Sequence, residues 1–90
     1  MEKHLTIKVI GRVQGVLFRD SARQWARKLR IRGFTRNESD GSVYIEAEGE
    51  EEKLKEFLDW CRAGSPLARV EQADFTWSDH VKNFTDFVIQ

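Results

Sequence analysis

The chain has 90 residues and carries 15 Lys and Arg against 15 Asp and Glu, which gives a formal net charge of zero at pH 7. Its length predicts a single domain over residues 1–90, and one Cys excludes an internal disulfide. The neutral balance argues against a dedicated nucleic-acid-binding protein, and the lack of a signal-peptide pattern or of an apolar run of about 20 residues predicts a cytoplasmic protein that does not enter a membrane.

The predicted elements begin with a strand and a helix. Residues 5–10 largely alternate between apolar and polar side chains and are rich in β-branched residues, which indicates a strand that ends at Gly11. From about Asp20 the apolar period changes to that of one helix face, and we expect a helix that ends within residues 30–33. The apolar residues of this face are Ala22, Trp25, Ala26 and Leu29.

A hairpin is expected next. Residues 34–38 and 43–48 both resemble strands, and the second run alternates without a break. They flank the turn 39–42, where Asp-Gly favours a tight connection between two antiparallel strands. Gly49 is expected to end the second strand.

The second half of the chain predicts a helix and two strands. Gly64 and Pro66 are stop signals after a second run of apolar residues at helical spacing, which are Leu54, Phe57, Leu58 and Cys61. Strands over 70–77 and 84–89 complete the chain. The order β-α-β-β-α-β with a terminal strand predicts an α+β, ferredoxin-like sandwich: a mostly antiparallel sheet, two helices on one face and a solvated opposite face.

Most residues with reactive side chains have a structural interpretation. Cys61 lies on the apolar stripe of the second helix and is expected in the core, since no His is placed beside it to activate a thiol. His4 and His80 have no recognisable partner, and no Cys or His cluster has zinc-ligand spacing. Neither a Ser-His-Asp set nor a carboxylate pair can be assembled. We therefore expect no metal and no other cofactor.

The loop between the first strand and the first helix, residues 11–19, is different. Its sequence, Gly-Arg-Val-Gln-Gly-Val-Leu-Phe-Arg, lacks the Gly-Lys-Ser/Thr of a Walker A loop and the third glycine of a dinucleotide fingerprint. Gly11 and Gly15 permit the backbone angles with which successive N–H groups surround an anion. Arg19 could close over phosphate oxygens in bidentate fashion. The competing interpretation is a plain turn with Arg19 facing solvent.

Three blocks of the chain carry a resemblance to one family. Residues 11–19 resemble the acylphosphatase signature G-x-V-Q-G-V-x-F-R, which binds phosphate. Residues 33–43 resemble the family's G-x-V-x-N-x-x-D-G-x-V segment, and residues 65–70 its S-P-x-A-x-V connection. Together the blocks cover nearly the whole chain in the right order. Leu17 and Thr35 are slight departures, and neither supplies an essential side chain.

The resemblance implies a small stand-alone acylphosphatase. Such an enzyme hydrolyses the carboxyl–phosphate anhydride of small acyl phosphates to a carboxylate and inorganic phosphate, with no metal or other cofactor. By the same resemblance, Asn37 orients the attacking water, and the phosphoryl group is held by Arg19 and the backbone amides of Gln14, Gly15, Val16, Leu17, Phe18 and Arg19. The implied partner is the substrate alone, with no nucleic acid and no membrane, and we expect a monomer.

The distribution of charge leaves other functions open. Residues 1–45 hold ten Lys and Arg against four Asp and Glu, a net charge of +6, and the rest of the chain has a net charge of −6. The loop could hold an anion without catalysis, and a basic helix face could bind nucleic acid through Arg23, Arg27 and Arg30. Asn37 favours the enzyme, because an anion binder has no need of it, and the two central strands offer only Tyr44 for stacking on bases. A role as a module of a larger carbamoyl-transfer protein is not expected for a chain that ends at residue 90.

Overall fold

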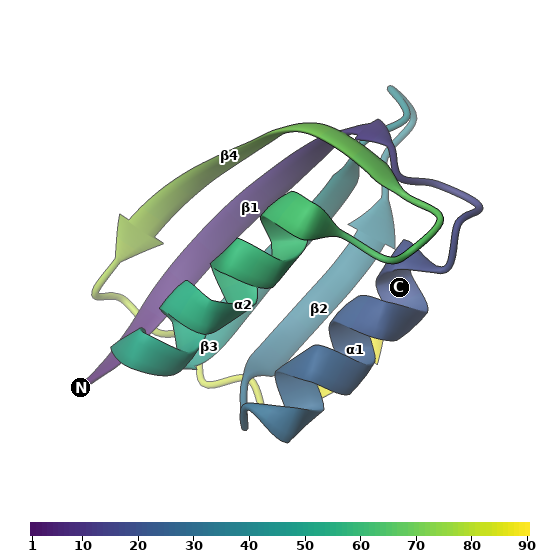
Figure 1. Ribbon diagram of the computed structural model, residues 1–90. Coiled ribbons are helices and arrows are strands. Elements are labelled where there is room, and N and C mark those ends of the chain that lie inside the picture. The colour runs from purple at the N-terminus through teal and green to yellow at the C-terminus, as the bar shows by residue number, and fades with distance from the viewer.

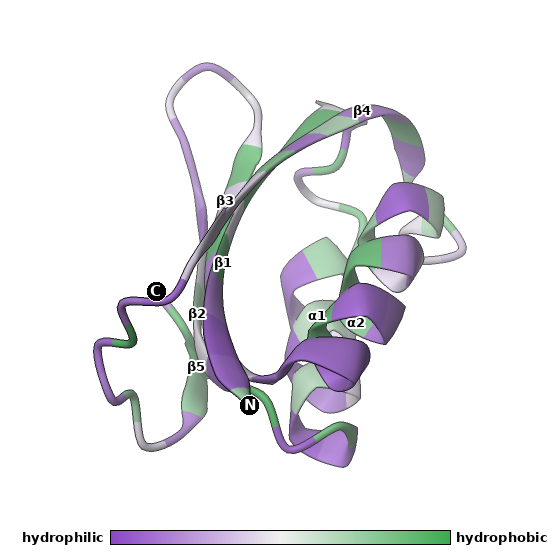
Figure 2. Ribbon diagram, turned by 90° about the vertical axis from the view of Figure 1, so that its left-hand side faces the viewer, coloured by the Kyte–Doolittle hydropathy of each residue, from purple (hydrophilic) through white to green (hydrophobic).

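Two helices pack on one face of a five-stranded sheet in the computed structural model, which describes residues 1–90 (Figure 1). In chain order the elements are β1 (Glu2–Arg12), α1 (Phe18–Lys28), β2 (Arg32–Asn37), β3 (Val43–Glu50), α2 (Glu51–Ala63), β4 (Arg69–Ser78) and β5 (Phe87–Ile89). Figure 2 shows both helices on the same side of the sheet. The predicted α+β, ferredoxin-like architecture is confirmed. Neither helix is long and apolar enough to cross a membrane.

The sheet order is β4-β1-β3-β2-β5, with β1 and β3 in the inner part of the sheet. Neighbouring strands are antiparallel except β2 and β5, which are parallel, so the sheet is mixed. Because β1 and β2 are both antiparallel to β3, they run in the same direction. Their last residues, Arg12 and Asn37, therefore lie at the same end of the sheet.

The core lies between the sheet and the helices. The inward residues of β1 and β3 alternate as predicted and are fully buried: Leu5, Ile7, Val9, Val43, Ile45 and Ala47. Cys61 is also fully buried, which confirms its structural role, and burial raises the pKa of its thiol. Trp25 is predicted to lie on the apolar face of the first helix, but its side chain is 40% exposed. The small side chains of Ala22 and Ala26 are fully buried and bring α1 close to the sheet, so the large indole lies at the rim of the contact.

Three element ends differ from the predictions. α1 begins at Phe18 rather than near Asp20, because Leu17 makes the turn into the helix with a φ of 64° and no side chain caps the first turn. β3 continues through Gly49, which remains paired with β1. The last strand begins at Phe87 rather than at residue 84, and residues 79–86 form a connection outside the strands.

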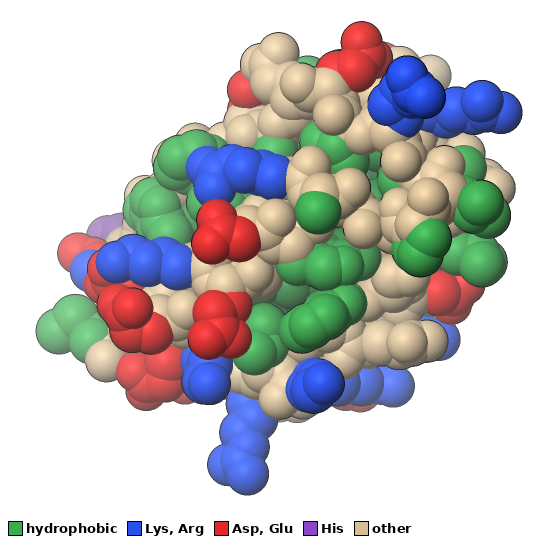
Figure 3. Space-filling view, viewed as in Figure 1, with side chains coloured by type: hydrophobic (Ala, Val, Ile, Leu, Met, Phe, Trp, Pro, Cys, Tyr) green, Lys and Arg blue, Asp and Glu red, His purple; other side chains and the backbone are tan.

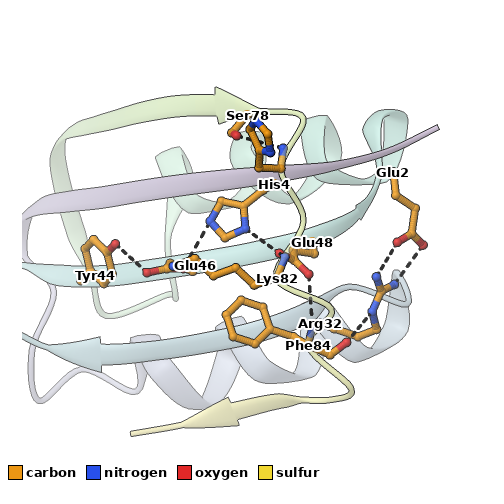
Figure 4. Close-up of polar contacts among 10 residues, drawn as sticks. Glu2, His4, Arg32, Tyr44, Glu46, Glu48, Ser78, Lys82 and Phe84 are labelled. Atoms are coloured by element: carbon orange, nitrogen blue, oxygen red, sulfur yellow. Dashed lines mark hydrogen bonds and ion pairs between the residues drawn. The ribbon is translucent and has the colours of Figure 1, made fainter.

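The face of the sheet opposite the helices is not simply solvated, contrary to the prediction. Residues 79–86, here called the strap, cross it between β4 and β5 (Figure 2). Beneath the strap, Glu48 is fully buried and His4 and Glu46 are nearly so. His4 Nδ1 donates to Glu48 Oε2 at 2.7 Å, and His4 Nε2 lies 3.3 Å from Glu46 Oε1 (Figure 4). The prediction that His4 has no partner is therefore wrong.

Glu48 ties the strap to the sheet through backbone donors. The amide of Lys82 donates to Glu48 Oε2, and the amide of Phe84 donates to Oε1 at 3.2 Å. Burial by itself would raise the pKa of Glu48. The hydrogen bonds from Lys82, His4 and Phe84 outweigh burial and hold the pKa below its ordinary value of 4.5. Glu48 is therefore ionised at neutral pH and acts only as an acceptor.

Glu48→Gln is expected to lower the free energy of unfolding at pH 7 by about 2 kcal/mol, because it removes the charge that these donors face. A carboxyl with a lowered pKa in the folded state stabilises the fold above its unfolded pKa, and this contribution is lost as the pH falls through the folded pKa. The difference between wild type and variant should therefore shrink below about pH 4.5. Urea unfolding at pH 7 and pH 3 measures it.

The control for this variant is Glu56→Gln, which alters an exposed carboxyl on α2. It should change stability by less than about 0.5 kcal/mol at either pH. A Glu48→Gln effect of the same size at pH 7 and pH 3 would contradict the charge-dependent role of Glu48.

Candidate active site

The loop that follows β1, residues 13–17, lies at the end of the sheet where β1 and β2 both stop (Figure 1). Apolar side chains reach the surface on this side of the molecule (Figure 3). A depression of about 330 Å³ lies against the loop, and its only cationic lining residue is Arg19. The full lining is Val13, Gly15, Leu17, Phe18, Arg19, Asp20 and Ile89.

The loop backbone has the alternation of an anion-binding nest. Gly15 and Leu17 have positive φ angles of 74° and 64°, whereas Val16 and Phe18 do not. Such alternation turns successive N–H groups toward one side of the chain. No backbone carbonyl accepts a hydrogen bond from the amides of residues 14–20. The first-turn amides of α1 are among them, so partial positive charge gathers at this point.

Gly11 does not belong to this loop, and the role predicted for it is wrong. It lies in β1 opposite Val70, with a φ of 135°. A Cβ atom at this position would lie 2.3 Å from the backbone oxygen of Arg69, so glycine is needed for the close approach of β4. Gly15, in contrast, has open space around it and is suited to the site by its φ angle alone.

Two side chains hold the loop from opposite sides. Gln14 Nε2 donates to the backbone oxygens of Glu38 at 2.8 Å and Ser42 at 2.9 Å, which joins the loop to the β2–β3 turn. The buried Ser65 Oγ donates to the backbone oxygen of Val16 at 2.8 Å. Because this peptide is trans, the N–H of Leu17 points opposite to the Val16 carbonyl, so the hydrogen bond from Ser65 fixes the orientation of one loop amide. Sequence reasoning used only the amide of Gln14 and gave Ser65 no role, although both residues stand in the motif blocks.

Arg19 is the second residue of α1, so the start of the helix positions its guanidinium at the depression. Its Nη1 donates to the backbone oxygen of Gln90 at 3.1 Å. Gln90 is held in turn beside β2, because its amide donates to the backbone oxygen of Thr35 at 2.8 Å. The other N–H groups of Arg19 have no protein acceptor and can bind a phosphate.

Asn37 is the last residue of β2 and is exposed. It pairs with Val43, whose buried side chain faces the helices, so both lie on the side of the sheet that carries the loop. The next residue, Glu38, accepts the hydrogen bond from Gln14 described above. Asn37 does not itself line the depression. The structure brings Arg19, the loop amides and Asn37 to one end of the sheet, and their roles remain predictions.

The turn after Asn37 is closed by several hydrogen bonds. Asp40 accepts from the Ser42 hydroxyl at 2.6 Å and from the Ser42 amide at 3.0 Å, and Lys8 Nζ lies 2.9 Å from its other oxygen. The Ser42 hydroxyl, followed by Lys8, holds the pKa of Asp40 well below its usual range. The turn therefore fixes the end of the strand on which Asn37 lies.

Comparison with known proteins identifies the family of this chain. The acylphosphatase family model matches residues 5–89. The chain belongs to the acylphosphatase family. It is 44% identical over 89 residues to the acylphosphatase of Salinibacter ruber, which covers 99% of this chain and 94% of that relative.

Solved acylphosphatase structures share the fold closely. The crystal structure of the acylphosphatase from Bacillus subtilis superposes with a TM-score of 0.96 at 36% identity and covers 98% of both chains. The structure of an acylphosphatase from Coxiella burnetii has a TM-score of 0.93 at 32% identity and covers 99% of this chain and 93% of that one. The resemblance seen in the sequence is therefore confirmed.

Contacts within the protein also bear on the alternative that the chain binds nucleic acid. Arg23 and Arg27 on the basic face of α1 each pair with an acidic side chain, at 3.3 Å and 3.0 Å. On the opposite face of the sheet, the Arg36 guanidinium lies 4.6 Å from the centre of the Tyr44 ring and occupies one of its faces. Two of the three arginines named for nucleic-acid binding, and the Tyr44 ring, are thus already engaged within the protein.

The candidate site has no cluster of metal-ligating side chains near it. Indeed, no group of three or more His, Cys, Asp or Glu residues in the chain is arranged to hold a metal ion. The groups that can offset negative charge at the depression are the guanidinium of Arg19 and the backbone amides.

Proposed function

We propose that this protein hydrolyses small acyl phosphates to a carboxylate and inorganic phosphate, with the phosphoryl group held by Arg19 and the amides of residues 14–19. The observation that carries the proposal is the run of unpaired amides in a nest-like loop beside Arg19. Membership of the acylphosphatase family and the names of the relatives support the same reaction.

Hydrolysis of an acyl phosphate depends more on stabilisation of negative charge than on general acid catalysis. The leaving group of an acyl phosphate is a carboxylate, which is weakly basic and departs without protonation. The attacking water forms a P–O bond, the P–O bond to the acyl group breaks, and its electron pair leaves on the carboxylate. Negative charge on the equatorial phosphoryl oxygens persists throughout, and preorganised N–H donors stabilise it in the transition state.

Asn37 is proposed to orient the water. Its side-chain oxygen can accept from water and its NH₂ group can donate, so it can fix the angle of attack. An amide is not a strong base, and we propose that an oxygen of the substrate's own phosphoryl group takes the proton. Cys61 is buried in the core, so it is not available as a nucleophile at the surface.

Because the loop, Arg19 and Asn37 all come from one chain, we propose that the monomer is active. The cytoplasmic location of the protein remains a prediction from the sequence.

The test of the proposed function is hydrolysis of benzoyl phosphate and acetyl phosphate by the purified protein, with p-nitrophenyl phosphate as a control substrate. The two acyl phosphates should be hydrolysed. The control should react far more slowly, because its leaving group is more basic than a carboxylate and the site offers no general acid. No hydrolysis of either acyl phosphate would overturn the proposal.

The reaction is expected to need no metal. With excess EDTA, the rate of benzoyl phosphate hydrolysis should stay within about twofold of the rate without chelator, since Arg19 and the amides supply the charge that a metal supplies in other phosphoryl-transfer sites. The same assay with added Mg²⁺ is the companion measurement. Loss of activity in EDTA and its recovery with a divalent metal would contradict this part of the mechanism.

A further inference from the structure

Leu17 combines two features that folding disfavours. Its large apolar side chain is 62% exposed and lies outside the hydrophobic core. Its backbone has φ 64° and ψ 23°, in the left-handed region that glycine or asparagine occupies more readily. Strained backbone of this kind is concentrated at binding sites. The question is therefore what the exposed side chain of Leu17 contacts.

Leu17 lines the depression together with Arg19. Val13, which is almost fully buried, and Ile89, which is half-buried in β5, line it as well. These three aliphatic residues, Val13, Leu17 and Ile89, are here called the apolar wall. The depression thus has an apolar wall beside the unpaired amides and the guanidinium.

We infer that the apolar wall receives the acyl group of the substrate and that Leu17 is a specificity-determining residue, favouring acyl phosphates with an apolar chain or ring over acetyl phosphate. This inference rests on the proposed function. An acyl phosphate has a doubly charged end and an uncharged end joined by one anhydride bond. If the amides and Arg19 hold the charged end, the uncharged end must lie within a few bonds of them, where the wall is.

The direction of the reaction agrees with this placement. In an in-line displacement the leaving group departs on the side opposite the attacking water. With water oriented by Asn37 at the end of β2, the acyl group lies away from Asn37. Leu17 lines the depression and Asn37 does not, so the two residues can contact different sides of the phosphoryl group.

Contact with Leu17 would act mainly on substrate binding. When the substrate binds, apolar surface of the acyl group and of Leu17 is removed from contact with water. This surface stays buried in the transition state. An interaction of equal strength in both states changes KM more than kcat. Acetyl phosphate, with a single methyl group, has little surface to bury against the wall.

The experiment compares Leu17→Asn and Leu17→Gly with wild type, because both replacements suit a positive φ angle and keep the backbone amide. The measured quantity is the ratio of kcat/KM for benzoyl phosphate to kcat/KM for acetyl phosphate. We expect this ratio to fall about tenfold in both variants, chiefly through a higher KM for benzoyl phosphate. Leu17→Met, which retains a large apolar side chain, should keep most of the wild-type ratio.

The matched control is Leu67→Asn, because Leu67 is 68% exposed and lies outside the depression, in the α2–β4 connection. It should leave the ratio unchanged. A wild-type ratio in both Leu17→Asn and Leu17→Gly would overturn the inference, including the case in which both substrates lose activity equally, since Leu17 would then act only through loop shape. Failure of the proposed function is distinguishable, because wild type would then hydrolyse neither substrate.

Discussion

Arg19→Ala is expected to reduce kcat/KM for benzoyl phosphate by about 10³-fold or more, the scale found when a phosphoryl-transfer site loses its arginine. The reason is that Arg19 is the only cationic residue that lines the depression. The amides of residues 14–20 can still face the phosphoryl oxygens, but each carries only a partial charge. Inhibition by inorganic phosphate should weaken as well, because the guanidinium binds the ground state and the transition state alike.

The activity of Arg19→Ala has to be compared with two controls, which are a measurement of its thermal unfolding and a variant of another exposed arginine. The guanidinium of Arg19 makes one hydrogen bond, to Gln90, in an exposed setting, so thermal unfolding of Arg19→Ala should remain close to wild type. Arg69→Ala removes an exposed arginine at the start of β4 and should keep wild-type activity. Arg19→Lys should lie between wild type and Ala, since it keeps the charge but loses the planar fork. An Arg19→Ala enzyme with a tenth of the wild-type activity would refute the assigned role.

The inner layer of the fold is readable from the sequence because its signals are local. Ile7 and Ile45 belong to alternating runs whose period of two reports one buried face. The opposite face is a different case. Glu46 and Glu48 alternate with apolar residues and are predicted to face solvent, yet they are covered by the strap, more than 30 positions later in the chain. The alternation of apolar and polar residues predicts which face of the sheet a side chain lies on. It does not predict whether a later segment of the chain covers that face.

The site divides in the same way. The loop after β1 and the end of β2 carry motif residues, so Arg19 and Asn37 could be named in advance. The hydrogen bonds that fix the loop could not, since Gln14 reaches Ser42 28 positions away and Ser65 reaches Val16 49 positions away. Leu17 is also instructive, because its left-handed backbone is visible only in the structure. Its exposed side chain lines the depression, and the contact inferred for the acyl group rests on this position, which the motif leaves variable.

Asn37→Ala is expected to lower kcat by about 10²-fold or more, because water that is no longer held at the correct angle attacks far less often. Unlike Arg19, Asn37 is proposed to act on the water and not on the phosphoryl group. The inhibition constant of inorganic phosphate should therefore stay within about twofold of wild type, and kcat and kcat/KM should fall together. Single-substrate kinetics with benzoyl phosphate, combined with phosphate inhibition, separates the two residues.

The position of Asn37 makes this variant a clean test. The side chain is exposed at the end of β2, and no hydrogen bond from it to another group of the protein is present, so its removal should leave thermal unfolding unchanged. Asn37→Gln keeps the amide but moves it outward by one methylene, and it should recover only part of the rate if the angle of attack is what matters. Full activity in Asn37→Ala would remove the water-orienting role. A loss of phosphate binding in proportion to the loss of rate would instead assign Asn37 to the phosphate cradle, together with Arg19 and the loop amides.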